Sequence, residues 1–277
     1  MMLAMRSRKK EDAGSAQGHA PRLLVEERRR RILEILDGQA RVTVEELVTR
    51  FGVSAVTVRG DLDALADLGA VVRSHGGALK RADAPDDVPI TVKETLHHAE
   101  KVRIGHAAAQ MIKDGETIML DSGTTTAEIA RQIRFLKLRS LNVITNALNI
   151  AMELANLPHV RLIMIGGVLR QMSYSLAGPP AEHTLRGLHA DRLFLGVDGL
   201  DPEIGLMTPD VVEAQLNAVM IQVSREVVVV ADASKFQRRS LSVIAKLDVV
   251  HKVITDSGTS PEVLAALRAR NVEVVVV

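Results

Sequence analysis

The sequence predicts a protein of two parts: an N-terminal winged helix-turn-helix and a C-terminal α/β domain built on a mainly parallel sheet. Two short amphipathic patterns joined by a glycine turn, over residues 43–68, indicate a helix-turn-helix. A hairpin containing two adjacent glycines follows directly and indicates the wing. After residue 99, runs of β-branched residues alternate with helical patterns, which is typical of parallel sheets covered on both faces.

The chain has 277 residues, enough for about two domains of ordinary size. Residues 1–21 are polar and mixed in charge, so we expect a disordered leader there. We assign the winged helix-turn-helix to residues 22–80, a polar, proline-containing linker to 81–98 and the α/β domain to 99–277. The first predicted helix, residues 23–37, carries four consecutive arginines from Arg28 to Arg31, and we expect some of them to face water or phosphate.

The helix-turn-helix pattern has a specific signal at the start of each helix. Thr43 is expected to cap a helix over 44–51, with Glu46 placed three residues later as in a capping box. Gly52 marks the turn, and Ser54 caps a second helix over 55–68. In such motifs the second helix enters the major groove of DNA with its N-terminal end nearest the bases.

The wing is predicted as strands over residues 70–73 and 78–80, joined through a His-Gly-Gly turn. Arg59 either reads a guanine bidentately or only binds phosphate, and the sequence leaves both open. For each candidate the alternative is simple surface exposure. The residues that we expect to contact DNA are Thr43, Ser54, Thr57, Arg59, Arg73 and His75.

One loop of the α/β half is suited to binding an anion. A strand over 117–120, a polar loop over 121–124 and a helix over 125–133 follow one another. A loop that leaves the C-terminal end of a strand and opens a helix presents backbone N–H groups and the positive end of the helix dipole, which favour phosphate. The alternative is an ordinary cluster of helix-capping hydroxyls.

Polar clusters follow several other predicted strands, and ligands of open α/β sheets bind outside the carboxyl ends of the strands. Lys235 could supply a positive charge for phosphate, while Asp198 and Glu213 could accept hydrogen bonds from hydroxyls. The alternatives are that Asp198 belongs to an ordinary turn and that Glu213 lies on the surface of its helix. We also expect Thr208-Pro209 to cap the helix over 210–224. The candidate ligand-binding residues are Asp121, Ser122, Gly123, Thr124, Thr125, Thr126, Asn146, Gly167, Asp198, Glu213 and Lys235.

Composition narrows the class of protein. Residues 1–80 carry 14 Lys/Arg and 11 Asp/Glu, a small basic excess that permits DNA binding without requiring it. Aromatic residues make up 2% of the chain, which argues against recognition of single strands by base stacking. Cysteine is absent, and no apolar run approaches a signal sequence or membrane span, so we expect a cytoplasmic protein without membrane attachment. The nine histidines show no metal-ligand spacing, and we expect neither metal nor cofactor.

The run VSAVTVRGDLDALADLGAVVRSHGGAL resembles the DNA-binding signature of the DeoR family of bacterial transcriptional regulators. Val53, Ser54, Thr57, Arg59, Asp61, Leu62 and the His75-Gly76-Gly77 turn match it, whereas Gly60 stands where the family usually has a second arginine. Glycine within a helix costs about 1 kcal/mol relative to alanine and removes a possible DNA contact. The blocks DSGTTT, VITNALNIA, IGGVLR, GVDGLD and VVVADASKF are similar to the effector domain of the same family.

The resemblance implies a repressor that binds double-stranded operator DNA, self-associates, and is released by a phosphorylated sugar. It also implies that the effector domain resembles ribose-5-phosphate isomerase and glucosamine-6-phosphate deaminase in fold. The run MTPDVVEAQLN is similar to the branch associated with amino-sugar use. The alternative is a sugar-phosphate isomerase or deaminase that carries a DNA-binding domain, because Asp198, Asp232 and Glu213 could serve as a general base.

Overall fold

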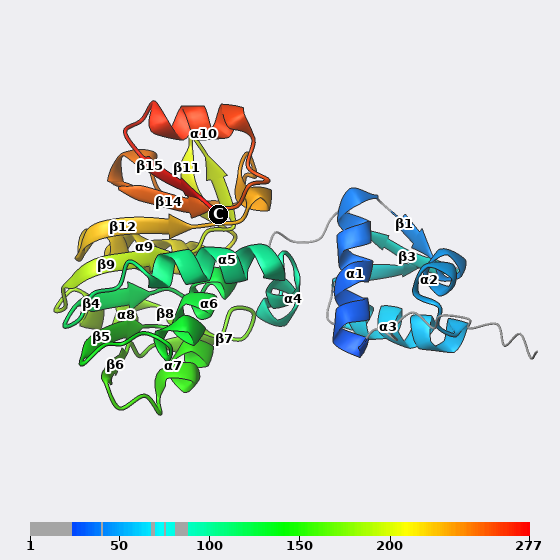
Figure 1. The fold of residues 1–277 in the computed structure, drawn as a ribbon, viewed down its shortest axis with the longest axis horizontal. Coiled ribbons are helices and arrows are strands. Elements are labelled where there is room, and N and C mark those ends of the chain that lie inside the picture. Colours follow the sequence, from blue (N-terminus) through cyan, green and yellow to red (C-terminus); the bar gives the residue numbers. More distant parts are fainter. Residues whose placement is uncertain (1–23, 40, 68–69, 75, 81–87) are drawn as a thin grey trace, which may run out of the picture.

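The computed structural model describes residues 24–39, 41–67, 70–74, 76–80 and 88–277. The expected leader, Ala40 and His75 lie outside them. Figure 1 shows two groups of elements, one formed by the N-terminal segments and one built around a large sheet. No helix in the described ranges is both long and apolar enough to cross a membrane.

The N-terminal elements form a winged helix-turn-helix, as the sequence predicts. Its three strands are antiparallel in the order β1-β3-β2, so the wing hairpin gains a third strand that the sequence pattern does not reveal. A shared apolar core, which includes Ile32, Leu47 and Leu62, holds helices and wing together. The elements are α1 (Val25–Gly38), β1 (Arg41–Thr43), α2 (Val44–Phe51), α3 (Ala55–Asp67), β2 (Val71–Ser74) and β3 (Gly77–Lys80).

The capping box predicted for α2 is confirmed. Thr43 Oγ1 accepts a hydrogen bond from the Glu46 N–H at 3.2 Å, and Glu46 Oε2 accepts one from the Thr43 N–H at 2.8 Å. Gly52 ends α2 in the left-handed conformation, φ +63°, which glycine adopts without strain and which turns the chain into α3.

The C-terminal domain contains a seven-stranded, fully parallel sheet, which confirms the predicted α/β class. Its order is β15-β14-β12-β9-β4-β5-β6. The chain enters at β4, proceeds outward through β5 and β6, and then returns to β9 on the other side of β4. The strands are β4 (Thr117–Leu120), β5 (Leu141–Thr145), β6 (Val160–Met164), β9 (Ala190–Leu195), β12 (Ser224–Val230), β14 (Lys252–Thr255) and β15 (Glu273–Val276).

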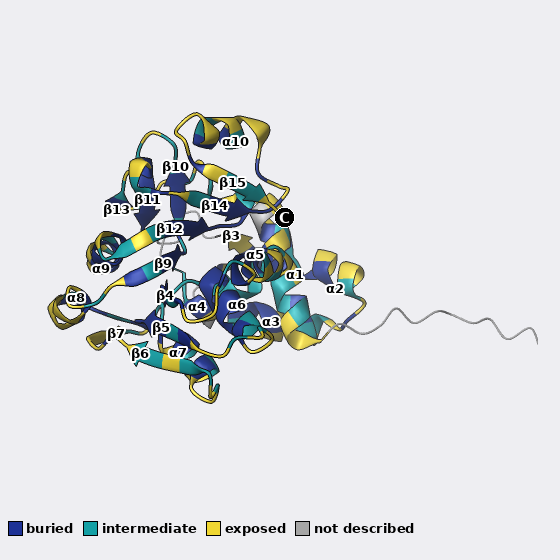
Figure 2. Cartoon of the chain, turned by 60° about the vertical axis from the view of Figure 1, so that its left-hand side comes forward, coloured by how far each residue is buried: buried dark blue, intermediate teal, exposed yellow. Residues whose placement is uncertain are grey.

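Helices cover both faces of this sheet because its strands are apolar on both faces (Figure 2). One apolar cluster packs α5, α6 and α7 against the sheet, and a second packs α8, α9 and α10 on the opposite face. The helices are α5 (His98–Ala109), α6 (Thr124–Ile133), α7 (Leu148–Leu154), α8 (Pro179–Leu185), α9 (Val211–Gln222) and α10 (Pro261–Arg268), with 3-10 turns η1 (Ala233–Lys235) and η2 (Leu247–Val249).

The structure adds elements that the sequence reading did not assign. Two small antiparallel sheets, formed by β10 (Gly199–Asp201), β11 (Gly205–Thr208) and β13 (Ser242–Ala245) and by β7 (Val168–Arg170) and β8 (Ser175–Ala177), flank the parallel one. A short helix, α4 (Ile90–Thr95), lies within the expected linker. The predicted cap at Thr208-Pro209 is wrong: Thr208 ends β11, and Asp210 caps α9 by accepting the Glu213 N–H at 2.9 Å.

Candidate functional site

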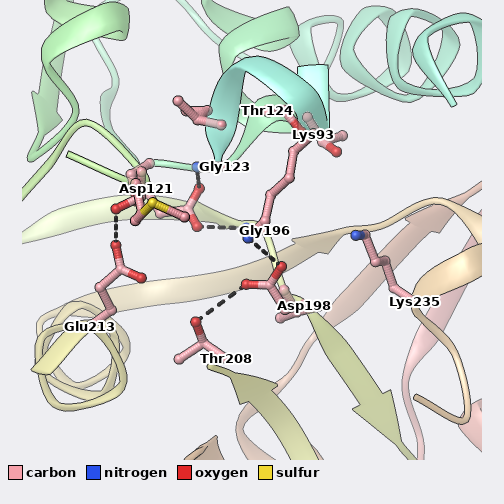
Figure 3. Close-up of a pocket in the computed structure, with 15 residues that line it drawn as sticks. Lys93, Asp121, Gly123, Thr124, Gly196, Asp198, Thr208, Glu213 and Lys235 are labelled. Carbon is pink, nitrogen blue, oxygen red and sulfur yellow. Dashed lines mark hydrogen bonds and ion pairs between the residues drawn. The ribbon is translucent and has the colours of Figure 1, made fainter. Parts of the chain in front are cut away.

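A cavity lies between β4 and β9, at the point where the sheet order reverses. A crevice opens at the carboxyl ends of two neighbouring parallel strands when their connections leave in opposite directions. Ligands of α/β sheets bind in such crevices. The loop after β4 and the loop after β9 form two of its walls, and α4, η1 and the β7–β8 turn approach from other sides (Figure 3). The lining residues are Ile90, Lys93, Asp121, Ser122, Gly123, Thr124, Thr125, Met172, Ser173, Gly196, Val197, Asp198, Thr208, Glu213 and Lys235.

Asp121 holds the two strand-end loops together. Its Oδ1 accepts hydrogen bonds from the Gly123 N–H at 3.0 Å and from Thr126 Oγ1 at 2.7 Å, and its Oδ2 accepts from the Gly196 N–H at 3.0 Å. Burial raises the pKa of Asp121 to about 6, against the opposing effect of these hydrogen bonds. Both carboxylate oxygens are thus already paired, so Asp121 positions the loops rather than presenting an open acceptor to a ligand.

The N-terminus of α6 carries hydrogen-bond donors that have no acceptor among the other described residues. No side chain caps this helix, and among the described residues none accepts the backbone N–H of Thr124, Thr125 or Thr126. Within the same ranges, the hydroxyls of Ser122, Thr124 and Thr125 also have no hydrogen-bond partner, and all three residues line the cavity. The N–H groups of Thr124 and Thr125, three hydroxyls and a positive helix end therefore converge on one small volume, an arrangement suited to phosphate.

Two lysines bring positive charge to this volume. The Lys235 ammonium makes no hydrogen bond or ion pair with any described residue, and burial lowers the pKa of Lys235 against the opposing effect of Asp198 and Asp232. The Lys93 Nζ lies 2.7 Å from Asp198 Oδ1. Burial by itself would raise the pKa of Asp198, but Lys93 and Lys235 outweigh it and hold that pKa below its ordinary value.

Glu213 is buried rather than being a helix-surface residue. Its Oε1 accepts hydrogen bonds from the hydroxyls of Ser173 and Ser175, and its Oε2 lies 3.4 Å from Arg170 Nη1. This carboxylate therefore anchors the β7–β8 hairpin to α9. Thr208 Oγ1 donates to Asp198 Oδ2 at 3.3 Å, which adds a further hydroxyl beside the cavity.

Three of the expected ligand-binding residues lie outside the cavity lining. Thr126 is fully buried, and its hydroxyl bonds back to Asp121 and to the Gly123 carbonyl. Asn146 is buried and donates to the Leu176 carbonyl at 3.2 Å. Gly167, with φ +139°, packs closely against the backbone of Ala177. These residues support the walls of the site.

The sequence analysis did not predict that Lys93, Ser173 and Thr208 line the cavity. Lys93 precedes the anion loop by about thirty residues and stands in a segment read as linker, so no local signal connected it with the loop. Ser173 and Thr208 belong to the small antiparallel additions that sequence periodicity did not reveal. Within residues 24–39, 41–67, 70–74, 76–80 and 88–277, no three His, Cys, Asp or Glu side chains are grouped to hold a metal ion.

The outer face of α3 is the candidate DNA interface. Ser54 accepts the Thr57 N–H at 3.1 Å and so caps α3, while Val56, an apolar residue that the sequence reading did not single out, is 76% exposed. Arg59 is exposed and has no partner among the described residues. Arg73, in contrast, is bound to Asp63 Oδ1 at 2.7 Å and to the Gly77 carbonyl, so it braces the wing against α3. His75 lies outside the described residues.

We expect Arg59→Ala to weaken operator binding by roughly 1–3 kcal/mol, because an exposed guanidinium on this face can pair with a base or a phosphate. Binding measured at several salt concentrations separates the two roles, since loss of a phosphate contact reduces the salt dependence for every DNA sequence alike. Arg270→Ala, an exposed arginine beyond α10, is the matched control. Operator binding equal to that of the control would exclude Arg59 from the interface.

Two family comparisons cover most of the chain. Residues 28–82 match the family described as "DeoR-like helix-turn-helix domain", and residues 96–257 match the one described as "DeoR C terminal sensor domain". The first match contains the winged helix-turn-helix from Arg28 onward, and the second contains Asp198 and the loop that opens α6.

Individual proteins are similar to this chain along nearly its whole length. The "Putative aga operon transcriptional repressor" of Escherichia coli O157:H7 is 41% identical over 253 residues, which cover 91% of this chain and 93% of the relative. The "Glycerol-3-phosphate regulon repressor" of Escherichia coli strain K12 is 31% identical over 242 residues, covering 87% and 95%. Among solved structures, the ribose 5-phosphate isomerase A of Methanocaldococcus jannaschii aligns with a TM-score of 0.37 and 20% identity over 49% of this chain and 53% of that one.

Proposed function

The chain belongs to the DeoR family of bacterial transcriptional regulators, and on this premise we propose that it represses a sugar-catabolic operon and leaves its operator when a phosphorylated sugar binds. Both relatives described above are named as repressors, and their similarity to this chain extends over nearly their full length. The protein is therefore a regulator and not an isomerase or deaminase with an added DNA-binding domain.

The unsatisfied donors at the N-terminus of α6 are the observation that carries the effector proposal. A phosphate monoester has three acceptor oxygens and a charge of about −1.5 to −2 at neutral pH. The N–H groups and hydroxyls of Thr124 and Thr125 and the Ser122 hydroxyl offer it donors, and Lys235 offers it charge. On the other side of the cavity, we expect Asp198 to accept hydrogen bonds from the sugar hydroxyls in exchange for its present partners.

On the DNA side, we propose that α3 enters the major groove and that the protein acts at least as a dimer. A single helix-turn-helix reads a short half-site, and two-fold symmetric proteins read palindromic operators with half-sites about one helical turn apart. Light scattering on the full chain, with and without operator DNA, measures the number of subunits.

The effector proposal is tested by thermal unfolding of the full chain with a panel of phosphorylated sugars. Galactosamine 6-phosphate, N-acetylgalactosamine 6-phosphate, glucose 6-phosphate and glycerol 3-phosphate are suitable members, with the unphosphorylated compounds and inorganic phosphate as controls. A ligand at 100 times its Kd adds about 2.7 kcal/mol to the stability of the folded state. For a domain of this size we expect one compound to raise the Tm by roughly 5–10 °C.

The same compound should also release a labelled operator fragment. If no phosphorylated compound raises the Tm, or if each sugar acts equally well without its phosphate, the assignment of the α6 loop as a phosphate site is wrong.

A further inference from the structure

The short helix α4 takes part in both halves of the protein. Val92 is 3% exposed and belongs to the apolar core of the winged helix-turn-helix, together with Val58 and Leu62. Lys93, the next residue, points the other way and lines the cavity of the sensor domain. Figure 1 shows α4 on the side of the sensor domain that faces α1 and α3. Two consecutive residues thus join the candidate effector site to the DNA-binding domain.

Further contacts fix α4 at both ends. At its start, the Ile90 N–H donates to the Met172 carbonyl at 2.7 Å, and the Ile90 side chain lines the same cavity. At its end, the buried Lys101 ammonium donates to the carbonyls of Lys93 and Leu96. Any displacement of the Lys93 backbone must therefore change contacts at both ends of a helix only six residues long.

We propose that Lys93 is a direct contact of the effector phosphate and that α4 carries the binding signal to the winged helix-turn-helix. This inference rests on the proposed function, because it requires a phosphorylated ligand in the cavity. In the structure, Lys93 extends past Thr124 and is paired with Asp198, while Lys235 approaches from the opposite side (Figure 3). A phosphate on the α6 loop lies between the two lysines.

The exchange of partners is favourable for Lys93. A phosphate carries more negative charge than one carboxylate and accepts charge-assisted hydrogen bonds from an ammonium. When the Lys93 Nζ turns to the phosphate, Asp198 is free to accept hydrogen bonds from sugar hydroxyls. Binding thus replaces one ion pair inside the protein by two contacts with the ligand.

This exchange explains how ligand binding can alter DNA affinity. A ligand shifts a conformational equilibrium only if it interacts differently with the two states. Here the phosphate draws the Lys93 ammonium away from Asp198, and the accompanying movement of α4 displaces Val92 within the core of the DNA-binding domain. The same linkage requires that operator DNA weaken effector binding by the same factor.

The test uses the full chain with Lys93→Met, which keeps the apolar stem and removes the charge, and Lys93→Arg, which restores it. Effector binding is measured with the sugar phosphate that most stabilises the wild type, and operator release is measured separately with the same compound at saturation. We expect Lys93→Met to bind the compound at least about tenfold more weakly, and we expect its operator affinity to be the same with saturating compound as without it. Lys93→Arg should recover both binding and release.

Lys137→Met, which removes an exposed lysine outside the cavity, is the matched control and should behave as the wild type. Hydrogen exchange of residues 88–96 supplies an independent measurement. The ligand should change the protection of this segment in the wild type and in Lys137→Met, but not in Lys93→Met.

The outcomes separate this inference from the proposed function. If the wild type neither binds nor responds to any phosphorylated compound, the proposed function fails. If the wild type responds and saturated Lys93→Met releases the operator to the same extent, α4 is not the connection through Lys93 and only this inference fails. Should Lys93→Met not fold, Lys93→Gln undergoes the same two measurements.

Discussion

Asp61→Ala is expected to destabilise the winged helix-turn-helix by about 3–5 kcal/mol and thereby to abolish operator binding. Asp61 is 2% exposed and lies in α3, while Arg28 is 5% exposed and lies in α1. The Arg28 Nε donates to Asp61 Oδ2, and the Arg29 Nε donates to Asp61 Oδ1 at 3.2 Å. Removing the carboxylate takes away the buried acceptor that Arg28 and Arg29 share, which is far more costly than losing an exposed ion pair.

The expected loss is a large fraction of the roughly 5–15 kcal/mol that stabilises a typical domain. Asp63→Ala is a close control, because Asp63 lies in the same helix and also pairs with an arginine, Arg73, but its side chain is 60% exposed. An exposed pair contributes about 0–1 kcal/mol. Thermal unfolding and operator binding should separate the two variants clearly.

In Asp61→Ala the sensor domain should still bind the effector. If Asp61→Ala unfolds at the same temperature as Asp63→Ala and binds operator equally well, then the buried pair does not hold α1 to α3.

The second large effect is expected at the anion loop. Replacing Ser122 with alanine and both Thr124 and Thr125 with valine removes three hydroxyl donors while nearly preserving side-chain volume. A hydrogen bond to a charged group contributes about 1.5–3 kcal/mol, so the triple variant should bind the effector roughly 1,000-fold more weakly or worse. The backbone N–H groups remain, and operator binding is expected to be unchanged because none of the three replaced hydroxyls bonds to another described residue.

Titration of the sugar phosphate against a complex of protein and labelled operator measures this effect. Thr184→Val, on α8, is the control, since the Thr184 hydroxyl bonds to a carbonyl of its own helix. Release curves of the triple variant that superimpose on those of the wild type would contradict the assignment of the loop.

The sequence determined those features that depend on neighbouring residues. Thr43 and Glu46 form a capping box because both partners lie within one helical turn, so their spacing alone predicts it. The β-branched runs predict a sheet buried on both faces, and the polar residues that follow β4 predict donors at a helix N-terminus, because each is a local pattern. The class of fold, the helix-turn-helix and the polar loop that opens α6 therefore follow from the sequence alone.

Only the tertiary structure decided which distant side chains share an environment. We expected some of the four consecutive arginines to face water or phosphate, and the structure shows that Arg28 is instead buried against Asp61, 33 residues away. Glu213, for which a place on the helix surface was one alternative, is buried among hydroxyls of a hairpin that periodicity did not reveal. Lys93 reaches a carboxylate 105 residues ahead in the chain, from a helix too short for its sequence pattern to reveal. Burial and pairing of a charge depend on packing between remote segments, and local periodicity contains no information about that packing.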